Sequence, residues 1–302
     1  KKEKQFIKEE TAYLLLANKN EHIARFIGTN YIAESSLFQL VIEYEPNGDL
    51  QSYLKTAIYT PTESLVFLIS LLDGLAYLHR SPDSQNETKP IIVHRDIKSK
   101  NVVVRANGSA ALVDFGLAEI HGEYDPKGNM YQVGTVNYMP PEVLKGQANC
   151  KIECLRAMDV YSVALIMWEV LNRTQVDDQD EVCPAELPFE KELTEEIAAH
   201  KIQFFNAPDY NPREEYKERP KIFYMKKIVH DLERRPVLRE KLNMNHITYW
   251  MALTTTEMWE WEIDGRLSAA SACTRLEKML MEHETGQPST FPPYRPPIQL
   301  NE

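Results

Sequence analysis

Two short segments of the chain carry, at fixed spacing, the residue types that phosphoryl transfer requires. Residues 94–101 read HRDIKSKN, and residues 114–116, which begin thirteen positions after the first segment ends, read DFG. Asp96 can accept the proton of an attacking hydroxyl group, and Lys98 can neutralise the charge of a migrating phosphate. Because the combined pattern is much longer than a lone Gly-rich loop, coincidence is a poor explanation, and phosphoryl-transfer chemistry is predicted.

A metal site is expected between the two segments. Asn101 ends the first segment and Asp114 begins the second. Their amide and carboxylate oxygens suit Mg²⁺, with Mn²⁺ as an alternative. The plain structural alternative is an aspartate that caps a turn beside a buried histidine. Lys98, Asn101 and the DFG triplet, all in register with Asp96, favour the chemical interpretation.

The composition is that of an ordinary globular protein with an acidic balance. The 302 residues are 43% hydrophobic and 26% charged, with a formal net charge of −11. This length allows one large domain or two smaller ones. Nucleic acid is not expected as the main partner, because phosphates demand a basic surface. The four cysteines are few and scattered, which favours a reducing compartment.

No membrane-spanning or secretory segment is expected from apolar runs. Residues 160–171, the most apolar run, are interrupted by Ser162 and Glu169, and a membrane helix needs roughly 20 apolar residues. No apolar stretch follows the charged start KKEK, so no signal peptide is expected. The chain itself is predicted to be soluble, and it could be one piece of a larger protein.

Apolar spacing predicts the elements that must position the chemical groups. Helix-like spacing occurs in residues 3–17, 49–54, 65–78, 158–171, 223–231, 247–261 and 269–284. β-like runs occur in residues 24–27, 37–44, 102–104 and 110–113. Asn107-Gly108 between the last two runs predicts a tight type I′ hairpin turn. Residues 118–146 and 174–219 lack clear periodicity and are expected to be irregular. From residue 286 onward, prolines predict a disordered or polyproline tail.

From about residue 3 to residue 284 the chain resembles protein kinases. Besides the two segments above, residues 134–135 (GT) and 140–142 (PPE) resemble the end of a kinase activation segment. Residues 264–267 (DGRL) resemble a later kinase motif, and the resemblance implies that Arg266 pairs with Glu142.

The resemblance implies an α+β fold of the bilobal protein-kinase type, with a mostly α C-lobe and an incomplete β N-lobe. The implied N-lobe part is 1–45, with helix C and two strands. The C-lobe would be 46–285, with an insertion at about 195–219, and the proline-rich tail would be 286–302.

Roles for individual residues follow from the same resemblance. Asp96 would be the catalytic base, with Lys98 and Asn101 as further catalytic residues, and Asn101 and Asp114 would hold Mg²⁺ beside ATP. The residues expected at the nucleotide are Glu9 of helix C, the hinge residues Ile42 (the gatekeeper), Glu43 and Glu45, and Val103 under the adenine. Ile42 and Val103 also fit a plain role in the strand core.

A hydrophobic spine, which links the two lobes of kinases, is implied as well. Tyr13 and Phe26 would be its upper members, and His94 and Phe115 its lower members. Asp159 would anchor His94 from below.

Further matches resemble the receptor Ser/Thr kinases of the TGF-β superfamily. Lys98 and Thr135 are typical of Ser/Thr kinases, in which this threonine bonds the catalytic aspartate and lysine. The segments that resemble the type II, activin-receptor-like branch include 187–190 (LPFE) and 235–239 (RPVLR). The resemblance implies an enzyme at the cytoplasmic face of the plasma membrane, with a type I receptor kinase as substrate and partner. A TGF-β-superfamily ligand would bind an ectodomain outside this chain.

Two parts of a kinase site are expected upstream of Lys1, namely the Gly-rich loop and the strand lysine that pairs with Glu9. A chain truncated at its N-terminus is therefore predicted, and by itself it is expected to bind ATP weakly. The alternative function is a catalytically impaired kinase-like fragment or pseudokinase that acts as a binding or scaffold module. A soluble, non-receptor Ser/Thr kinase is the third hypothesis.

Arg95 could bind a phosphorylated activation segment. Residues 117–133 contain Tyr124 and Tyr131 but no serine or threonine. Activation by Ser/Thr phosphorylation within this stretch is thus excluded, and constitutive activity is expected.

Overall fold

A computed structural model of the chain describes residues 2–35, 37–82, 89–121, 133–147, 151–205 and 221–292, without the side chains of residues 2 and 200–205. Several predictions fall outside these residues. They concern Tyr124 and Tyr131, the greater part of the insertion expected at 195–219, and the tail beyond residue 292.

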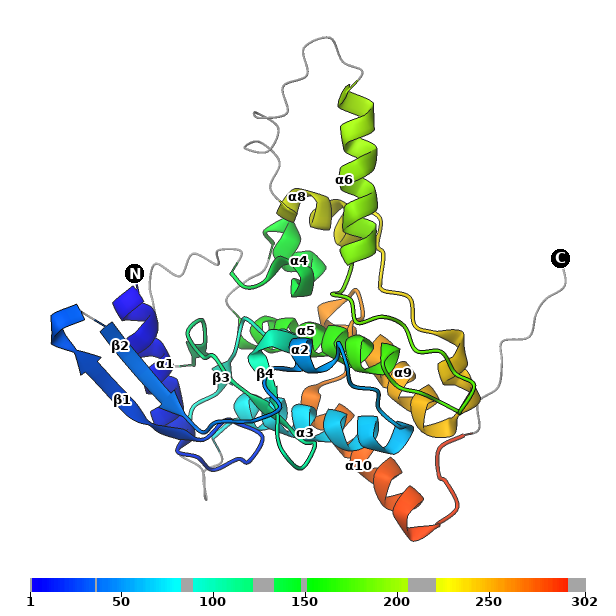
Figure 1. Cartoon of the computed structure of the whole chain (residues 1–302), viewed down its shortest axis with the longest axis horizontal. Helices are drawn as coiled ribbons and strands as arrows, with labels where there is room; N and C mark the ends of the chain where they lie inside the picture. Colours follow the sequence, from blue (N-terminus) through cyan, green and yellow to red (C-terminus); the bar gives the residue numbers. More distant parts are fainter. Residues whose placement is uncertain are drawn as a thin grey trace, which may run out of the picture.

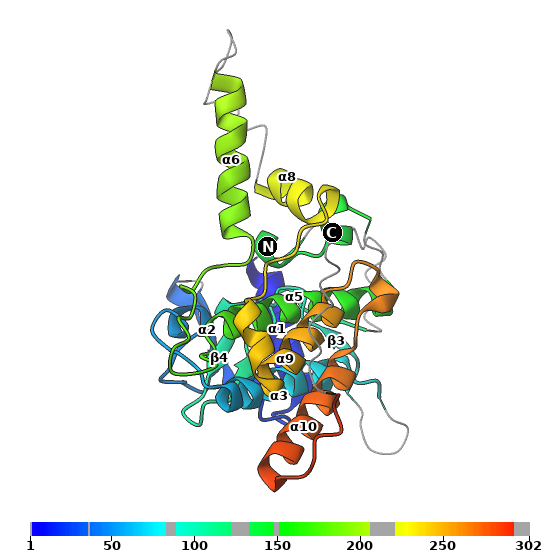
Figure 2. The same cartoon turned by 90° about the vertical axis from the view of Figure 1, so that its right-hand side faces the viewer.

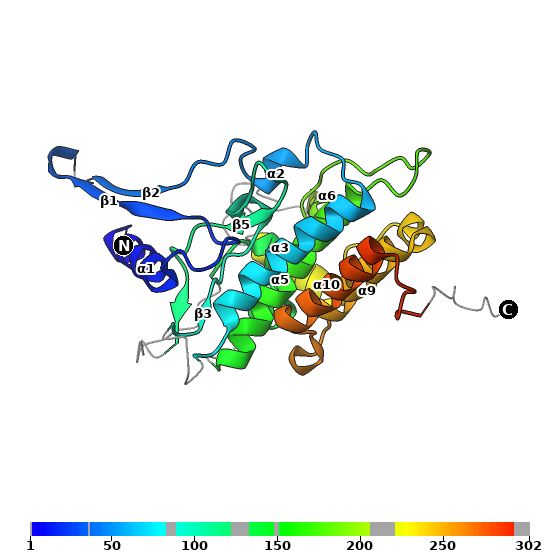
Figure 3. The same cartoon turned by 90° about the horizontal axis from the view of Figure 1, so that it is seen from below.

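The N-terminal part consists of one helix packed on a two-stranded ribbon. Helix α1 (Lys2–Leu16) precedes the antiparallel strands β1 (Phe26–Ile32) and β2 (Leu37–Ile42). Phe6 of the helix contacts Phe38 of the ribbon, with 4.9 Å between ring centroids. The ribbon extends away from the rest of the molecule (Figures 1 and 3).

The remainder of the chain is mostly helical. Its helices are α2 (Leu50–Tyr53), α3 (Pro61–His79), α4 (Pro141–Lys145), α5 (Ile152–Asn172), α6 (Glu190–Phe205), α8 (Lys221–Lys226), α9 (His246–Met258) and α10 (Ala269–Thr285). Its short strands pair antiparallel, β3 (Ile92–Val93) with β6 (Glu119–Ile120) and β4 (Val102–Val104) with β5 (Ala110–Leu112). The 3₁₀ turns are Ala33–Ser35, Ser99–Asn101, Val136–Tyr138, Glu240–Met244 and Ile263–Gly265, and a π turn at Lys227–Asp231 follows α8.

Helix α3 lies at the centre of the helical part. Thr60 and Glu63 form a reciprocal capping box, and Pro61 occupies the first turn, so the helix has a sharp start. It packs against α5, α9, α10 and β5 (Figure 3). By length and composition α3 could cross a membrane, and 61% of its apolar window is buried inside the protein. The apolar spacing predicts a helix at 65–78. It does not predict a segment long enough to cross a membrane, because Asp73 and Gly74 interrupt the apolar run.

The loop after α1 fixes the N-terminal part onto the helical part. Leu112 N–H donates to His22 O at 2.9 Å, and Ala24 N–H donates to Leu112 O at 3.0 Å. Gly74 of α3 allows this close approach, since a Cβ at that position would lie 2.8 Å from His22 O. Helix α1 is therefore held in a defined position relative to the β4–β5 hairpin.

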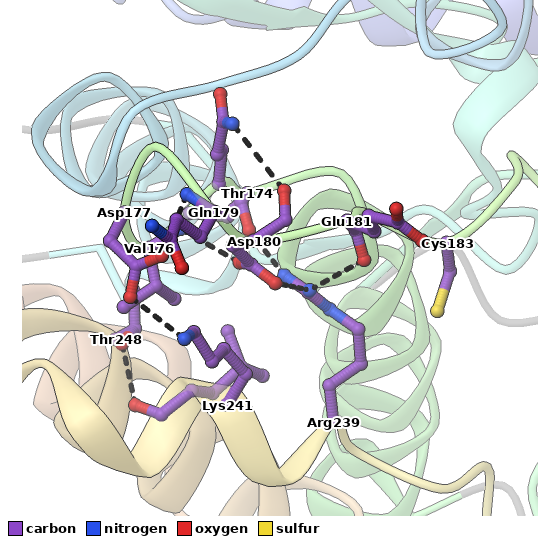
Figure 4. A network of polar contacts seen from close by, with 12 residues as sticks. Thr174, Val176, Asp177, Gln179, Asp180, Glu181, Cys183, Arg239, Lys241 and Thr248 are labelled. Atoms are coloured by element: carbon purple, nitrogen blue, oxygen red, sulfur yellow. Dashed lines mark hydrogen bonds and ion pairs between the residues drawn. The ribbon is translucent and has the colours of Figure 1, made fainter.

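The segment after α5 is closed by polar contacts to the predicted 235–239 motif (Figure 4). Arg239 donates to Asp180 at 2.8 Å and to the carbonyl oxygens of Leu171, at 3.3 Å, and Thr174. The Arg239 and Asp180 side chains are 10% and 4% exposed, so their charges compensate each other inside the protein. The motif thus fixes the C-terminal end of α5.

The turn between β4 and β5 differs from the predicted one. The hairpin forms as expected, but Gly108 has a left-handed backbone and Asn107 does not. A type I′ turn needs positive φ at both central residues, so that prediction was wrong. Instead, Gly108 N–H donates to Arg105 O at 3.0 Å within a longer loop.

Helix α6 also differs from expectation. Residues 190–205 form a regular helix rather than irregular structure, and this helix projects from the body of the protein beside α8 (Figures 1 and 2). Its sequence is rich in Glu and also contains Lys and Ala, all of which are strong helix formers. Acidic composition and nearby prolines obscure this propensity.

The first residues of the predicted tail are docked on α9 and α10. The Phe291 ring lies 5.0 Å from the ring of Trp250, and Thr290 Oγ1 donates to Glu282 at 2.5 Å. Residues 286–292 are thus held by specific contacts, and the expectation of disorder was wrong for this stretch.

Candidate active site

Asp96 lies at the centre of a closed set of hydrogen bonds. Lys98 Nζ donates to Asp96 Oδ2 at 2.6 Å and to Thr135 Oγ1 at 3.0 Å, and Thr135 Oγ1 donates to Asp96 Oδ1 at 2.8 Å. The Asp96 side chain is only 9% exposed. Because both carboxylate oxygens are held by charge-assisted or short bonds, the carboxylate has a fixed orientation, as a base aligned on a hydroxyl group requires.

Gly134 allows Thr135 to reach this set. Its φ is +110°, and a Cβ at this position would lie 2.7 Å from Arg95 O. Only glycine fits such a close approach in this conformation. The Gly-Thr pair is therefore a steric requirement of the site.

Asp159 of α5 holds the backbone of residues 94–101, the predicted catalytic loop, from below. Its Oδ2 accepts from His94 N–H at 2.7 Å and its Oδ1 accepts from Arg95 N–H at 2.9 Å. His79 Nε2 lies 3.0 Å from Oδ2. Arg95 has a φ of +67°, which is unfavourable for a residue with a side chain. These hydrogen bonds to a buried carboxylate compensate for that strain, and the predicted anchor role of Asp159 agrees with its position.

Asn101 and Asp114 are brought together by the hairpin that connects them. Val113 N–H donates to Asn101 O at 3.0 Å, so Asn101 lies beside the residue that precedes Asp114. Asn101 Nδ2 donates to Asp96 O at 3.0 Å and to Asp96 Oδ2 at 3.3 Å. The amide nitrogen of Asn101 is thus engaged by Asp96, and its amide oxygen is the atom that could bind a cation.

This pair of oxygen donors fits Mg²⁺. Within the described ranges, no group of three or more His, Cys, Asp or Glu side chains could hold a metal by itself. Mg²⁺ commonly takes only one or two protein ligands and completes its shell with water and phosphate oxygens. Asn101 and Asp114 could supply those two ligands.

The rings of the predicted spine form one continuous series of contacts. Tyr13 and Phe26 are stacked at 5.4 Å between centroids, Tyr13 meets Phe115 edge-on at 4.9 Å, and Phe115 lies 5.0 Å from His94. Helix α1, the ribbon and both catalytic segments are thus connected through four side chains. Such aromatic contacts favour a single relative placement of these elements.

Glu9 of α1 lies near Asp114. Burial raises the pKa of Glu9 to about 7, and the negative charge of Asp114 raises it as well, while a hydrogen bond with the Phe115 backbone lowers it. No basic side chain in the described part of the chain contributes to this shift. The structure therefore brings Glu9 to the predicted place but without a cationic partner there.

Of the predicted hinge residues, Ile42 ends strand β2, and Glu43 and Glu45 follow the strand. Ile42 packs against the core, whereas the carboxylates of Glu43 and Glu45 lie 3.8 and 3.0 Å from Arg105 Nη1. A nucleotide would therefore meet backbone groups of this segment rather than these two carboxylates. Val103 lies in β4 and is partly buried. Arg105 is a residue that the sequence reasoning missed, because its partners are about sixty positions away.

A buried network of Ser99, Tyr138 and Glu169 was also missed. Tyr138 Oη donates to Glu169 Oε1 at 2.6 Å and lies 2.9 Å from Ser99 Oγ. Burial raises the pKa of Glu169 to about 8, and hydrogen bonds from Tyr138 and Ser99 lower it. The network joins the catalytic loop, the segment after Gly134 and helix α5. A glutamate inside the most apolar run of the chain was its only sequence signal.

Glu142 and Arg266 form the ion pair that the sequence predicts. Arg266 Nη1 and Nη2 donate to Glu142 Oε1 and Oε2, each at 2.8 Å. The side chains are 1% exposed for Arg266 and 11% for Glu142. Arg266 also lies 5.1 Å from the centroid of the Tyr161 ring. This bidentate pair ties α4 to the segment before α10.

Comparison with known families identifies the domain. The family described as "Protein kinase domain" matches residues 1–273. The chain belongs to the protein kinase family. The predicted α+β protein-kinase fold is thereby confirmed, and the structure contains the spine-ring contacts and the Glu142–Arg266 pair that the resemblance implies.

Individual relatives of this chain are receptors by name. "Activin receptor type-2A" of Homo sapiens is 32% identical over 275 residues, which are 90% of this chain and 49% of that protein. The same receptor of Xenopus laevis is 31% identical over 278 residues, 90% of this chain and 49% of the receptor. "Cell surface receptor daf-4" of Caenorhabditis elegans is 30% identical over 261 residues, 86% of this chain and 32% of the receptor.

The chain spans about half the length, or less, of these curated relatives. Their similarity confirms the predicted resemblance of this kinase domain to the activin-receptor-like branch. It also supports the predicted class, a protein serine/threonine kinase.

Proposed function

We propose that this domain transfers the γ-phosphate of ATP to serine or threonine residues of a type I receptor kinase, as part of a type II receptor of the TGF-β superfamily. The observation that carries the proposal is the closed hydrogen-bond set of Asp96, Lys98 and Thr135. It holds an oriented carboxylate next to an ammonium group, which is the pair that a hydroxyl nucleophile and a migrating phosphate require.

In this proposal the chain's own residues position and neutralise the reacting groups. Asp96 accepts the proton of the substrate hydroxyl group, and Lys98 Nζ neutralises charge on the transferred phosphate. Thr135 keeps both side chains aligned. Mg²⁺ held by Asn101 and Asp114 would neutralise the phosphates of ATP.

The nucleotide would lie between the N-terminal part and the catalytic loop. Backbone groups around Ile42, Glu43 and Glu45 would bond the adenine, and Val103 would lie under it. Glu9 would act through a cation near the phosphates. In this reading residues 1–45 are the N-lobe part and residues 46–285 the C-lobe.

The receptor setting of the proposal is supported by the names of the relatives. A kinase domain in such a receptor would work at the cytoplasmic face of the plasma membrane. Its ligand, a TGF-β-superfamily protein, would bind an ectodomain of the longer protein.

A binding or scaffold module is the second candidate. The observation that favours it is Glu9, which has a raised pKa and no cationic partner in the described part of the chain. A chain that cannot clamp ATP phosphates could still dock a partner through its helical part.

Phosphate transfer in the longest natural protein that contains this chain distinguishes the two candidates. The protein is incubated with labelled ATP, Mg²⁺ and the cytoplasmic part of a type I receptor. We expect labelled phosphoserine and phosphothreonine in the receptor. A stable complex without labelling would contradict the proposal and support the binding module, and label on tyrosine alone would contradict the serine/threonine assignment.

A further inference from the structure

Glu119 occupies a position between the catalytic loop and helix α1. It is the first residue of β6 and pairs with Val93 of β3, directly before the catalytic loop begins. Arg95 Nη1 donates to Glu119 Oε2 at 2.9 Å, and Lys8 Nζ of α1 lies 3.7 Å from the same oxygen. One carboxylate oxygen thus faces two cations from two different elements.

The burial of these groups shows which contact is the stronger one. The Arg95 side chain is 11% exposed, Glu119 is 28% exposed and Lys8 is 52% exposed. A guanidinium group withdrawn from water needs an anion, since an uncompensated buried charge is strongly unfavourable. Glu119 therefore satisfies Arg95, and Lys8 adds a weaker, screened attraction.

The two cations that contact Glu119 each lie next to a predicted site residue in the sequence. Arg95 immediately precedes Asp96, and Lys8 immediately precedes Glu9. Within the described residues, Lys8–Glu119 is the ion pair that connects α1 to the helical part. Other links from α1 include the ring contact of Tyr13 with Phe115 and a hydrogen bond between the Glu9 carboxyl group and the Phe115 backbone, neither of which joins opposite charges. Glu119 thus contacts the two residues that immediately precede Asp96 and Glu9.

We propose that Glu119 is a positioning residue that holds helix α1 in register with the catalytic loop through its own carboxylate. The inference rests on the proposed kinase function. The side-chain carboxylate supplies the negative charge that Arg95 needs, so alignment of the site requires no phosphate group on the segment after Asp114. This gives a structural cause for the activity without Ser/Thr phosphorylation that residues 117–133 lead us to expect.

The first test measures the order of α1 by amide hydrogen exchange in the longest natural protein that contains the chain. Glu119→Gln removes the charge, and Glu119→Asp retains it. We expect exchange of residues 2–16 to rise roughly fivefold in Glu119→Gln and much less in Glu119→Asp. Exchange of α10 should not change. Glu257→Gln is the matched control, because Glu257 forms a comparable partly exposed pair with Arg275 at 2.7 Å.

A second measurement distinguishes coupling from a local role in β6. If Glu119 acts through Lys8, the double variant with Lys8→Gln should exchange no faster in α1 than Glu119→Gln alone. Additive effects of the two substitutions, or α1 exchange that is unchanged in Glu119→Gln, would overturn the inference.

Phosphate transfer provides the functional readout. We expect kcat of Glu119→Gln to fall by roughly fivefold, with KM for the peptide substrate unchanged, and Glu119→Asp to recover most of the loss. Unchanged kcat in Glu119→Gln would overturn the inference. If the unsubstituted protein transfers no phosphate, the proposed function fails, but the exchange measurements still decide whether Glu119 holds α1.

Discussion

The acidic residues of the candidate site are compensated differently in the helical part and in the N-terminal part. In the helical part, Asp96 is compensated by Lys98 and Thr135 through bonds of 2.6 and 2.8 Å. In the N-terminal part, Glu9 lies near Asp114, and its pKa is raised to about 7 by burial and by that second negative charge. Asp96 thus has a cationic partner in the structure, whereas Glu9 has none among the described residues.

Packing follows the same division. Helices α3 and α5 bury nearly all their apolar side chains, whereas the ribbon leaves Ile27 64% and Val41 43% exposed. The groups that would act on a protein substrate are therefore organised by the chain's own core. The ribbon, whose strand β2 ends at the predicted gatekeeper Ile42, has less of its apolar surface covered.

The largest expected effect concerns the compensated carboxylate. Asp96→Asn should lower phosphate transfer by about 10²–10⁴-fold, because general-base catalysis contributes this much. Folding should be retained, since the amide still accepts a bond from Thr135. The rate is measured with labelled ATP, and the matched control is Asp177→Asn, which removes a surface pair with Lys241. Undiminished phosphate transfer by Asp96→Asn would contradict the proposed role of Asp96 as the base.

The next effect concerns the stability of the helical part. Arg266→Ala leaves the Glu142 carboxylate without its partner, and breaking a buried pair costs about 3–5 kcal/mol. Urea unfolding measures the loss. Arg275→Ala, which removes the exposed pair with Glu257, should cost about 0–1 kcal/mol. Equal losses in the two variants would show that the pair at α4 is not part of a dry core.

A smaller effect is expected on the pH dependence of stability, and it comes from Glu169 in the network of Ser99, Tyr138 and Glu169. The pKa of Glu169 is raised from 4.5 to about 8 in the folded protein. Between these values the folded state keeps a proton that the unfolded chain has released, so the free energy of unfolding falls as pH rises. Glu169→Gln removes this fall. The two proteins should have similar Tm at low pH, and the variant should gain on the order of 2 kcal/mol above the pKa. Parallel pH profiles would contradict the assignment.

The sequence predicts the site best where its residues are close along the chain. Asp96, Lys98 and Asn101 lie within one loop, and their spacing alone indicates their chemistry. The spine rings and the Glu142–Arg266 pair come from distant positions, and only the resemblance to kinases predicted them. The sequence around Arg105 and Glu119 does not indicate a role for either residue, because the partners of each lie far away in the sequence and are brought close only by the fold.

The fold was predictable where apolar residues are dense over the length of a helix, as in α3 and α5, or recur at helical spacing, as in α10. Helix α6 begins with a strongly acidic stretch and lies in a region punctuated by prolines, so its pattern resembles that of a polar loop. The turn at Asn107 was mispredicted because one dipeptide does not specify the length of a loop. Residues 286–292 contain turn formers and prolines, but Phe291 gives them an apolar anchor that composition does not reveal.

The response to Mg²⁺ tests the central difference between the two regions most directly. The thermal unfolding of the chain is measured with ADP, with and without Mg²⁺, for the unsubstituted protein and for Asp114→Asn. If the Asp114 carboxylate beside Glu9 binds Mg²⁺, Mg²⁺ together with ADP should raise the Tm of the unsubstituted protein and should have little effect on Asp114→Asn. An equal rise in both proteins, or no rise in either, would contradict the account.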